Sequence, residues 1–413
     1  MTLVVPATRA AAAGVRVSIA CGALGVELAL CREAAEEWAQ QTGNSVSIVN
    51  TPNSSSDRFS LYVQLLASRS PEIDVLQIDV VWPGMLGSHL LDLGPAFADR
   101  VPGMFPALTD NNTVDGRLVA IPWYVDAGVL YYRRDLLEKH GIAPPQSWDE
   151  MTRAAGTIQT RERAAGQSGL WGFVFQGKPY EGLTCDALEW IASWGGGSFV
   201  DADGDITVNN PLAATALRRA ASWIGTIAPR GVLNYDEESA RGVFQTGNAV
   251  FMRNWPYAWA LAQGEDSPVR GRVGVIALPK GGPDGRHAGT LGGWQLAVSR
   301  YSRHPQAATD LVRHLTSARI QKMRAIRGAY NPTIMALYHD PEILAANPFF
   351  EALLPSFVEA IPRPARQTGA HYNQVSAAIW RTVHAVLSGS TDAPEGLEQL
   401  QQSLDRIRHR ARW

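Results

Sequence analysis

The residues best suited to chemistry in this 413-residue chain are aromatic side chains interleaved with carboxylates. In residues 244–258, a helix end, a glycine turn and a buried apolar run deliver Trp255 and Tyr257 to the end of a predicted strand. A further aromatic residue, Trp294, directly follows two glycines. Flat ring faces beside carboxylates suit a polar, uncharged, ring-shaped ligand. The first expectation is therefore a sugar.

Three carboxylates are predicted to converge near these rings. The segment up to residue 81 has the order strand, helix, strand, helix, strand, which predicts a mostly parallel sheet in an α/β fold. Ligands of such sheets bind beyond the carboxyl ends of the strands. Glu27 follows the first strand, Asp79 ends the third, and Asp126 follows a later apolar segment. We therefore expect all three at one edge of the sheet.

Carboxylates beside tryptophans also suit a glycoside hydrolase, which needs two carboxyl groups across the scissile bond. A hydrolase using Glu27, Asp79 and Asp126 is therefore the enzymatic alternative. Such enzymes keep one acid protonated in an apolar pocket, and none of these three is obviously so placed. The chain has no HExxH zinc motif and no GxSxG nucleophile elbow, so we assign no catalytic residue and no metal ligand.

Length and composition exclude several classes of protein. A chain of 413 residues predicts two domains. The net charge of -2 gives no reason to expect nucleic acid or an anionic membrane as partner. No apolar stretch reaches 18 residues, the length that spans a membrane. The glycine-rich segment 280–293 contains no phosphate-binding motif, so no cofactor is predicted.

The three cysteines, Cys21, Cys31 and Cys185, form no metal-binding spacing. Because their number is odd, we expect free, buried thiols rather than a disulfide framework. Residues 1–13 are apolar but are broken by proline and arginine and lack a basic start, so they make a poor signal peptide.

Local signals predict several element boundaries. Ser147 with Glu150 forms a capping box at the start of a helix. Residues 201–208 resemble the start of a calcium loop, but the sixth position of that loop is not glycine, and Leu212 stands where a glutamate ligand is needed. A hairpin turn at residues 203–204 is therefore favoured. A helical C-terminus from residue 372 is interrupted near residues 389–394.

An ordered set of segments resembles the extracellular sugar-binding proteins that feed ABC importers, particularly the trehalose/maltose-binding branch. The matching segments are residues 57–76, 79–83, 122–136, 193–197, 244–247, 292–294 and 372–376. Together they span nearly the whole chain after Val15, in the order found in that family.

The resemblance implies a two-lobe periplasmic-binding-protein fold, with three crossings forming the hinge and a ligand in the cleft. The N-terminal lobe is expected at residues 15–125 plus 290–328, and the C-terminal lobe at 126–289 plus 329–413. The resemblance further implies a periplasmic or lipid-anchored protein that is not an enzyme, with the periplasm as the expected location. We expect a monomer that hands a glucose-containing disaccharide, trehalose or maltose, to membrane permease subunits. Another sugar or a polyol is the alternative ligand.

The resemblance also assigns site residues by matching motif. Hydrogen bonds to sugar hydroxyls are implied for Glu27, Arg58, Asp79 and Asp126. Stacking on sugar rings is implied for Tyr124, Trp255 and Trp294, and backbone amides for Gly292 and Gly293. On composition alone, Trp123 is the equal of Tyr124. Arg363 is expected as the last polar contact, with Arg366 as the alternative because the following segment is longer than in the family.

Overall fold

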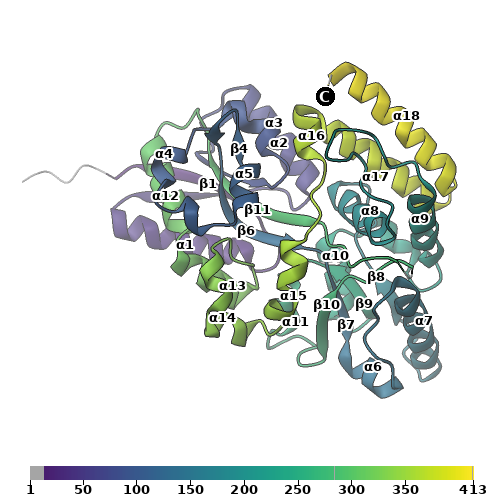
Figure 1. Cartoon of the computed structure of the whole chain (residues 1–413). Coiled ribbons are helices and arrows are strands. Elements are labelled where there is room, and N and C mark those ends of the chain that lie inside the picture. Colours follow the sequence, from purple (N-terminus) through teal and green to yellow (C-terminus); the bar gives the residue numbers. More distant parts are fainter. Residues whose placement is uncertain (1–13, 283, 412) are drawn as a thin grey trace, which may run out of the picture.

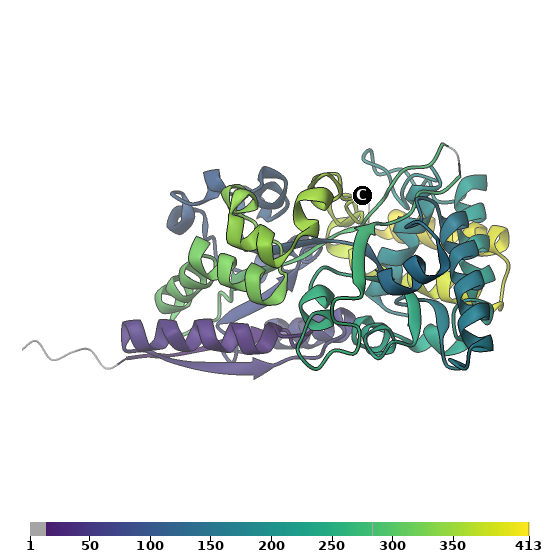
Figure 2. The same ribbon diagram turned by 90° about the horizontal axis from the view of Figure 1, so that it is seen from below.

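Two α/β lobes lie side by side in the computed structural model, which describes residues 14–282, 284–411 and 413 (Figure 1, Figure 2). Each lobe has a central β-sheet that is covered by helices. The weak signal-peptide pattern falls on residues 1–13, which lie outside the described part. Among the described residues, no helix has both the length and the apolar character needed to cross a membrane.

The sheet of the first lobe has the strand order β2-β1-β3-β11-β6. Its strands are β1 (Arg16–Cys21), β2 (Ser45–Asn50), β3 (Val75–Asp79), β6 (Ile121–Ala127) and β11 (Leu291–Val298). β1 pairs in parallel with β2 and β3, whereas β11 pairs antiparallel with β3 and β6. The prediction of a mostly parallel sheet is therefore corrected to a mixed sheet. The reason is that β6 leaves this lobe and β11 returns to it, without the helical crossover that joins parallel strands.

The second lobe has a sheet of order β10-β7-β9-β8 in which only β8 and β9 pair in parallel. Its strands are β7 (Val129–Arg133), β8 (Trp171–Val174), β9 (Ala249–Asn254) and β10 (Val273–Ala277). Its helices are α6 (Arg134–His140), α7 (Trp148–Ala164), α8 (Glu181–Ser193), α9 (Pro211–Trp223), η3 (Arg230–Asn234), α10 (Glu237–Gln245), α11 (Ala258–Ala262), α17 (Tyr372–Ser388) and α18 (Ala393–Ala411).

Helices also cover the first sheet and connect the lobes. Those of the first lobe are α1 (Glu27–Thr42), α2 (Ser55–Ala67), α3 (Pro83–Leu86), η1 (Gly87–His89), α4 (Gly94–Phe97), η2 (Val101–Gly103), α5 (Pro106–Asn111), α12 (Pro305–Leu315) and α13 (Ala318–Gly328). A two-stranded ribbon joins β4 (Thr113–Val114) to β5 (Arg117–Leu118). The chain then passes through η4 (Met335–His339), α14 (Pro341–Ala346), α15 (Phe349–Val358), α16 (Ala365–Thr368) and η5 (Gly369–His371).

The helix cap, the hairpin turn and the helix break predicted from local sequence signals are present in the structure. Ser147 Oγ accepts a hydrogen bond from the Glu150 amide at 3.3 Å, and α7 begins at the next residue. The segment 201–208 is a hairpin turn, since the Asp201 amide donates to the Asp205 carbonyl at 2.9 Å. A break at Gly389, with φ of 78°, separates α17 from α18.

The lobes are joined where β6 continues into β7 and where β10 leads into β11. The first connection turns at Gly128, where a Cβ would lie 2.0 Å from a Glu189 carboxylate oxygen. At the second, the Leu291 amide donates to the Ile361 carbonyl at 2.8 Å, so a third segment runs alongside. The expected residue limits of the two lobes stay a prediction.

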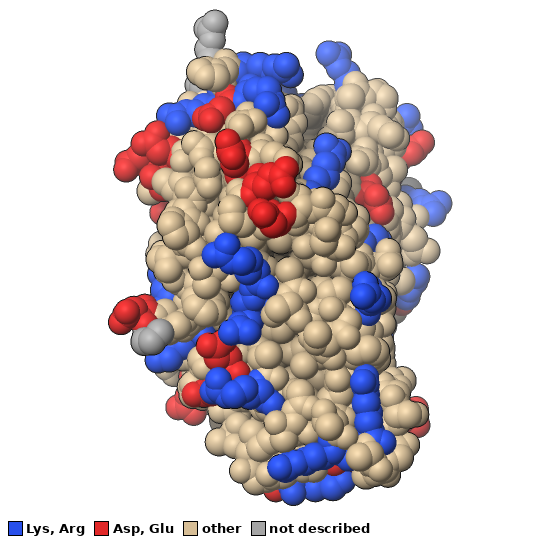
Figure 3. All heavy atoms as spheres, turned by 90° about the vertical axis from the view of Figure 1, so that its right-hand side faces the viewer, with Lys and Arg blue, Asp and Glu red and all other residues tan. Residues whose placement is uncertain are grey.

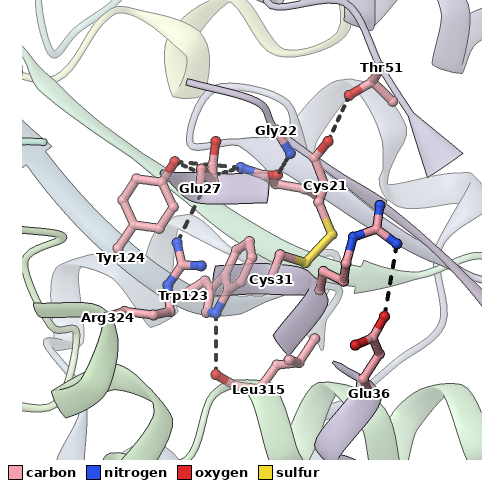
Figure 4. Close-up of a disulfide and its surroundings, with 12 residues drawn as sticks. Cys21, Gly22, Glu27, Cys31, Glu36, Thr51, Trp123, Tyr124, Leu315 and Arg324 are labelled. Atoms are coloured by element: carbon pink, nitrogen blue, oxygen red, sulfur yellow. Dashed lines mark hydrogen bonds and ion pairs between the residues drawn. A yellow bond between two sulfur atoms is a disulfide. The ribbon is translucent and has the colours of Figure 1, made fainter. Parts of the chain in front are cut away.

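Cys21 and Cys31 form a disulfide, which corrects the expectation of free thiols for this pair (Figure 4). Cys21 ends β1 and Cys31 lies in the second turn of α1, so the strand-to-helix junction brings the two sulfurs together. Cys185 is free and buried, as expected.

Candidate functional site

A cavity of about 580 Å³, counting the space at its mouth, lies between the two lobes. It is lined by Leu24, Asn53, Ser55, Asp79, Tyr124, Asp126, Glu181, Gly182, Cys185, Glu237, Trp255, Tyr257, Gly292, Gly293, Trp294, Tyr330 and Arg363. Chain segments of both lobes thus share one polar and aromatic cavity.

The structure brings together all but two of the residues assigned from sequence. Those lining the cavity are Asp79, Tyr124, Asp126, Trp255, Gly292, Gly293, Trp294 and Arg363. Glu27 and Arg58 are fully buried one layer further from the cavity. Arg366 does not line the cavity, so Arg363 is the arginine that reaches it.

Arg363 lies at the centre of a charged cluster that bridges the lobes. Its Nη2 is 2.9 Å from Asp79 Oδ1, at the end of β3, and its Nη1 is 2.7 Å from Glu181 Oε1, at the start of α8. Ser376 and Tyr372 of α17 also donate to the Glu181 carboxylate. Burial raises the pKa of Glu181, while the charge of Arg363 opposes that rise. The cluster therefore links the two lobes through ion pairs at the wall of the cavity.

Asp126 is the carboxylate with unused hydrogen-bonding capacity. Its side chain lines the cavity, but its Oδ1 has no hydrogen-bond partner among the described residues. Burial, with a further contribution from the charge of Glu27, raises the pKa of Asp126 to about 8. An unpartnered buried acceptor costs about 1–3 kcal/mol. A ligand hydroxyl that donates to this oxygen would remove that cost.

Trp255 is held by close packing against the glycines of β11. A Cβ on Gly292 would lie 2.9 Å from Trp255 Cζ3, so no larger residue fits beside the indole. Gly293 has φ of 121°, and a Cβ there would lie 2.4 Å from the Tyr124 carbonyl oxygen. The indole Nε1 of Trp255 donates to Glu237 Oε1 at 3.4 Å. Gly292 therefore lets a side chain of the second lobe pack against a strand of the first, while Gly293 lets β11 approach the backbone of Tyr124.

Arg58 contacts Trp294 rather than the cavity. Its Cζ lies 4.4 Å from the centroid of the Trp294 ring, and its Nε and Nη2 each donate to the Pro52 carbonyl at 3.1 Å. The edge of Trp82 packs against the same indole, with ring centroids 5.4 Å apart. Arg58 therefore supports an aromatic ring of the cavity from within the first lobe.

Glu27 fixes the orientation of Tyr124 (Figure 4). Its carboxylate accepts from the Tyr124 hydroxyl at 2.5 Å and from Gln77 Nε2 at 2.7 Å, and Arg324 lies 3.8 Å away. Trp123 faces the interior, where its Nε1 donates to the Leu315 carbonyl at 3.2 Å. Tyr124 is therefore the aromatic residue of this pair that reaches the cavity.

Several lining residues were not assigned from sequence, among them Glu181, Glu237 and Tyr330. Glu181 opens α8, every residue of which is buried although several are polar. Acidic residues in a wholly buried helix are a signal for a polar site, because buried charges need partners. Tyr257, expected at the edge of a cleft with Trp255, packs on Gly25 of the first lobe and donates to Glu238 at 2.7 Å.

A family model described as bacterial extracellular solute-binding protein matches residues 27–322. The chain belongs to this family. It is 51% identical over 398 residues to a probable ABC transporter-binding protein of Deinococcus radiodurans, covering 96% of this chain and 94% of that protein. The motif-based assignment to the solute-binding proteins of ABC sugar importers is confirmed.

Solved structures agree with the fold. The structure of maltose-bound T. maritima MalE3 superposes with a TM-score of 0.91 at 40% identity, covering 95% of this chain and 100% of that chain. A solute-binding protein of Agrobacterium vitis with bound D-mannitol has a TM-score of 0.84 at 22% identity, covering 96% and 99%. The two-lobe α/β class is therefore confirmed. Because the relatives are binding proteins of transporters, the prediction that this solute-binding protein is not an enzyme is also confirmed.

Proposed function

We propose that this solute-binding protein captures a glucose-containing disaccharide, trehalose or maltose, in the cavity between its lobes. It then delivers the sugar to the membrane permease of an ABC importer, acting as a monomer in the periplasm. The observation that carries the proposal is the convergence of two indoles, Trp255 and Trp294, with the carboxyl group of Asp126, whose Oδ1 has no hydrogen-bond partner among the described residues. Indoles cover the apolar faces of sugar rings, and an unpartnered carboxyl oxygen accepts from a hydroxyl.

The expected energies fit a reversible carrier. Hydrogen bonds to charged groups contribute about 1.5–3 kcal/mol each. Association costs roughly 4–15 kcal/mol. Four or five such bonds with two stacked rings are compatible with about micromolar affinity, near -8.2 kcal/mol.

The hydrolase alternative loses support from the surroundings of two of its three carboxyl groups. Asp79 is ion-paired with Arg363, and Glu27 is held by Tyr124 away from the cavity. A relative whose structure contains maltose, at 40% identity over 95% of this chain, supports a disaccharide ahead of other ligands. The mannitol-bound structure, at 22% identity, supports the fold alone.

Charge on the surface gives no argument for another class of partner. Figure 3 shows basic and acidic side chains interspersed on the face at the right-hand end of Figure 1. With a net charge of -2, this distribution suits a small neutral ligand better than a polyanion.

A thermal-shift screen tests the proposal. Trehalose, maltose, glucose, mannitol and ribitol are compared at equal concentration, because a ligand of the native state stabilises by about 2.7 kcal/mol at 100 times its Kd. Trehalose or maltose is expected to give the largest increase in Tm, with no glucose released after overnight incubation. A larger increase with a polyol, or released glucose, would contradict the proposal. Light scattering tests whether the protein is a monomer, and cell fractionation tests whether it lies in the periplasm.

A further inference from the structure

Aromatic rings of the cavity have buried arginines stacked on them. The Cζ of Arg253 lies 4.0 Å from the centroid of the Trp255 ring, and that of Arg58 lies 4.4 Å from Trp294. Arg324 lies 4.5 Å from the ring of Tyr330 and 5.2 Å from that of Tyr124. A guanidinium at these distances is attracted by the negative face of the ring.

These guanidiniums lie outside the lining of the cavity. The four rings line the cavity, whereas none of the three arginines does. Arg58 and Arg253 are 0% exposed, and Arg324 is 1% exposed. A buried cation is costly unless it is paired, so its retention in each of these places needs a reason.

Each arginine is held by a different set of partners. Arg253 donates from Nε to Glu189 Oε2 at 2.8 Å and from Nη1 to Gln176 at 3.1 Å. The nitrogens of Arg324 make no hydrogen bond among the described residues. Arg324 is instead enclosed by aromatic rings, with Trp123 at 3.8 Å, and it lies 3.8 Å from Glu27. What the three arginines share is therefore contact with an aromatic ring of the cavity, whereas their hydrogen-bonding and ionic partners differ.

We propose that Arg58, Arg253 and Arg324 act through the rings they support, fixing ring orientation and making the cavity discriminate against cationic ligands in favour of neutral ones. The inference rests on the proposed sugar-binding function and adds a determinant of its specificity. In this role the arginines are positioning residues that do not touch the ligand.

The discrimination follows from electrostatics. A positive charge behind a ring draws π-electron density away from the opposite face, which weakens the attraction of that face for a second cation. It also repels an ammonium group directly across a medium of low dielectric constant. The C–H groups of a sugar carry little charge, so a neutral ligand loses little. Asp79 and Glu181 are already paired with Arg363, and the charges of Arg253 and Arg324 lower the pKa of Asp126 against the larger effect of burial.

Arg58 is the residue to test. Its guanidinium donates to a backbone carbonyl, and the described residues offer it no ion pair with a carboxylate. A neutral replacement therefore leaves no buried acid without its partner. Arg253, in contrast, neutralises Glu189 and Asp186, so its removal would test the fold and the site together.

The experiment compares two pairs of ligands on the full chain. Calorimetry measures Kd for trehalose and maltose and for the 2-amino-2-deoxy analogue of each, at a pH where the amine is charged. Arg58→Met and Arg58→Gln remove the charge, with the second variant available if the first does not fold. Arg58→Lys keeps the charge without the planar stack. Arg16→Met, at an exposed arginine on β1, controls for net charge.

The ratio of the amino-sugar Kd to the neutral-sugar Kd is expected to fall by about fivefold or more in Arg58→Met or Arg58→Gln. It should stay near the wild-type value in Arg58→Lys and Arg16→Met, even where both affinities decrease. A purely structural role would weaken both ligands equally and leave the ratio unchanged, which would overturn the inference alone. A wild-type protein that binds none of the four ligands would overturn the proposed function and the inference with it.

Discussion

The guanidinium of Arg363 donates to Asp79 across the boundary between the lobes, with Nη2 2.9 Å from Oδ1. Asp79 ends a central strand of the first lobe, while Arg363 lies in the segment that leads into α16 and α17. The same guanidinium reaches Glu181 of the second lobe. One side chain thus holds acids of both lobes at the cavity.

Replacing Arg363 with methionine is expected to weaken sugar binding by more than about a hundredfold. Asp79 and Glu181 would lose the group that holds them together at the cavity, and the same change is expected to lower the free energy of unfolding by about 3–5 kcal/mol, which urea unfolding measures separately. Calorimetry measures the loss. Arg366→Met makes the same change of charge outside the cavity, and its affinity should stay within about twofold of wild type. Equal losses in the two variants would show that charge alone, not the bridge, is responsible.

Trp255→Ala is expected to raise the Kd for sugar by more than about tenfold with the fold intact, because a stacked aromatic ring dominates contact energy in such sites. Trp380→Ala, at a partly buried indole on α17, serves as the matched control. Circular dichroism checks the fold, and calorimetry checks the affinity. Unchanged affinity would remove Trp255 from the site.

Gly292→Ala is expected to displace the Trp255 indole and to weaken sugar binding by about tenfold. The added methyl would lie 2.9 Å from Trp255 Cζ3, closer than packed carbon atoms approach. Gly84→Ala is the control, since a Cβ there meets no heavy atom within 4 Å. If both variants bind like wild type, the indole does not depend on this glycine.

Asp126→Asn is expected to make the unliganded protein more stable than wild type, by a margin that grows as pH rises. Burial raises the pKa of Asp126 from 3.8 to about 8, so folding favours the protonated carboxyl. That contribution to stability is fully present below pH 3.8 and is lost as pH rises through about 8. Asparagine does not ionise, so its advantage in free energy of unfolding over wild type should grow by more than about 1 kcal/mol from pH 4 to pH 9.

Urea unfolding at several pH values measures this difference for Asp126. Asp110→Asn, at an exposed position, should show a difference that is flat with pH. A flat profile for Asp126→Asn would mean that this carboxyl is ionised throughout the range.

Replacing both Cys21 and Cys31 with serine is expected to lower the free energy of unfolding by about 2–3 kcal/mol. The closed loop is short, with a sequence separation of 10, so the entropy removed from the unfolded chain is moderate. Urea unfolding with and without reductant provides the measurement. Reductant should destabilise the wild type and leave the double variant unchanged. A wild type that is insensitive to reductant would contradict the bond.

Periodicity and motif order predicted most of the fold. The helix that begins at Glu27 closes at Gly43, as its turn signal indicates, and Ser147 caps α7 as expected. The direction of β11 could not be predicted in this way. Its partners are β3 and β6, far away in sequence, and antiparallel entry depends on the path of the chain through the second lobe.

The site was predictable where a residue follows a strand or a glycine turn. Asp79 and Trp294, which are register partners on neighbouring strands, belong to this group. Glu181 was missed because its position depends on how α8 packs against α17, which a local pattern does not encode. The disulfide was missed because an odd number of cysteines obscured a pairing that the strand-to-helix junction allows. Glu27 and Arg58 lie buried in the expected region but do not line the cavity.

The bond between Cys21 and Cys31 also affects how the newly made protein matures. Disulfides form in oxidising compartments, so a copy still inside the reducing cytosol has only hydrogen bonds and packing to secure the loop that carries Leu24 to the cavity. Oxidation after secretion ties both ends of that loop to the rest of the lobe. In the secreted protein this loop is therefore more resistant to local unfolding than it is in the reduced cytosolic precursor.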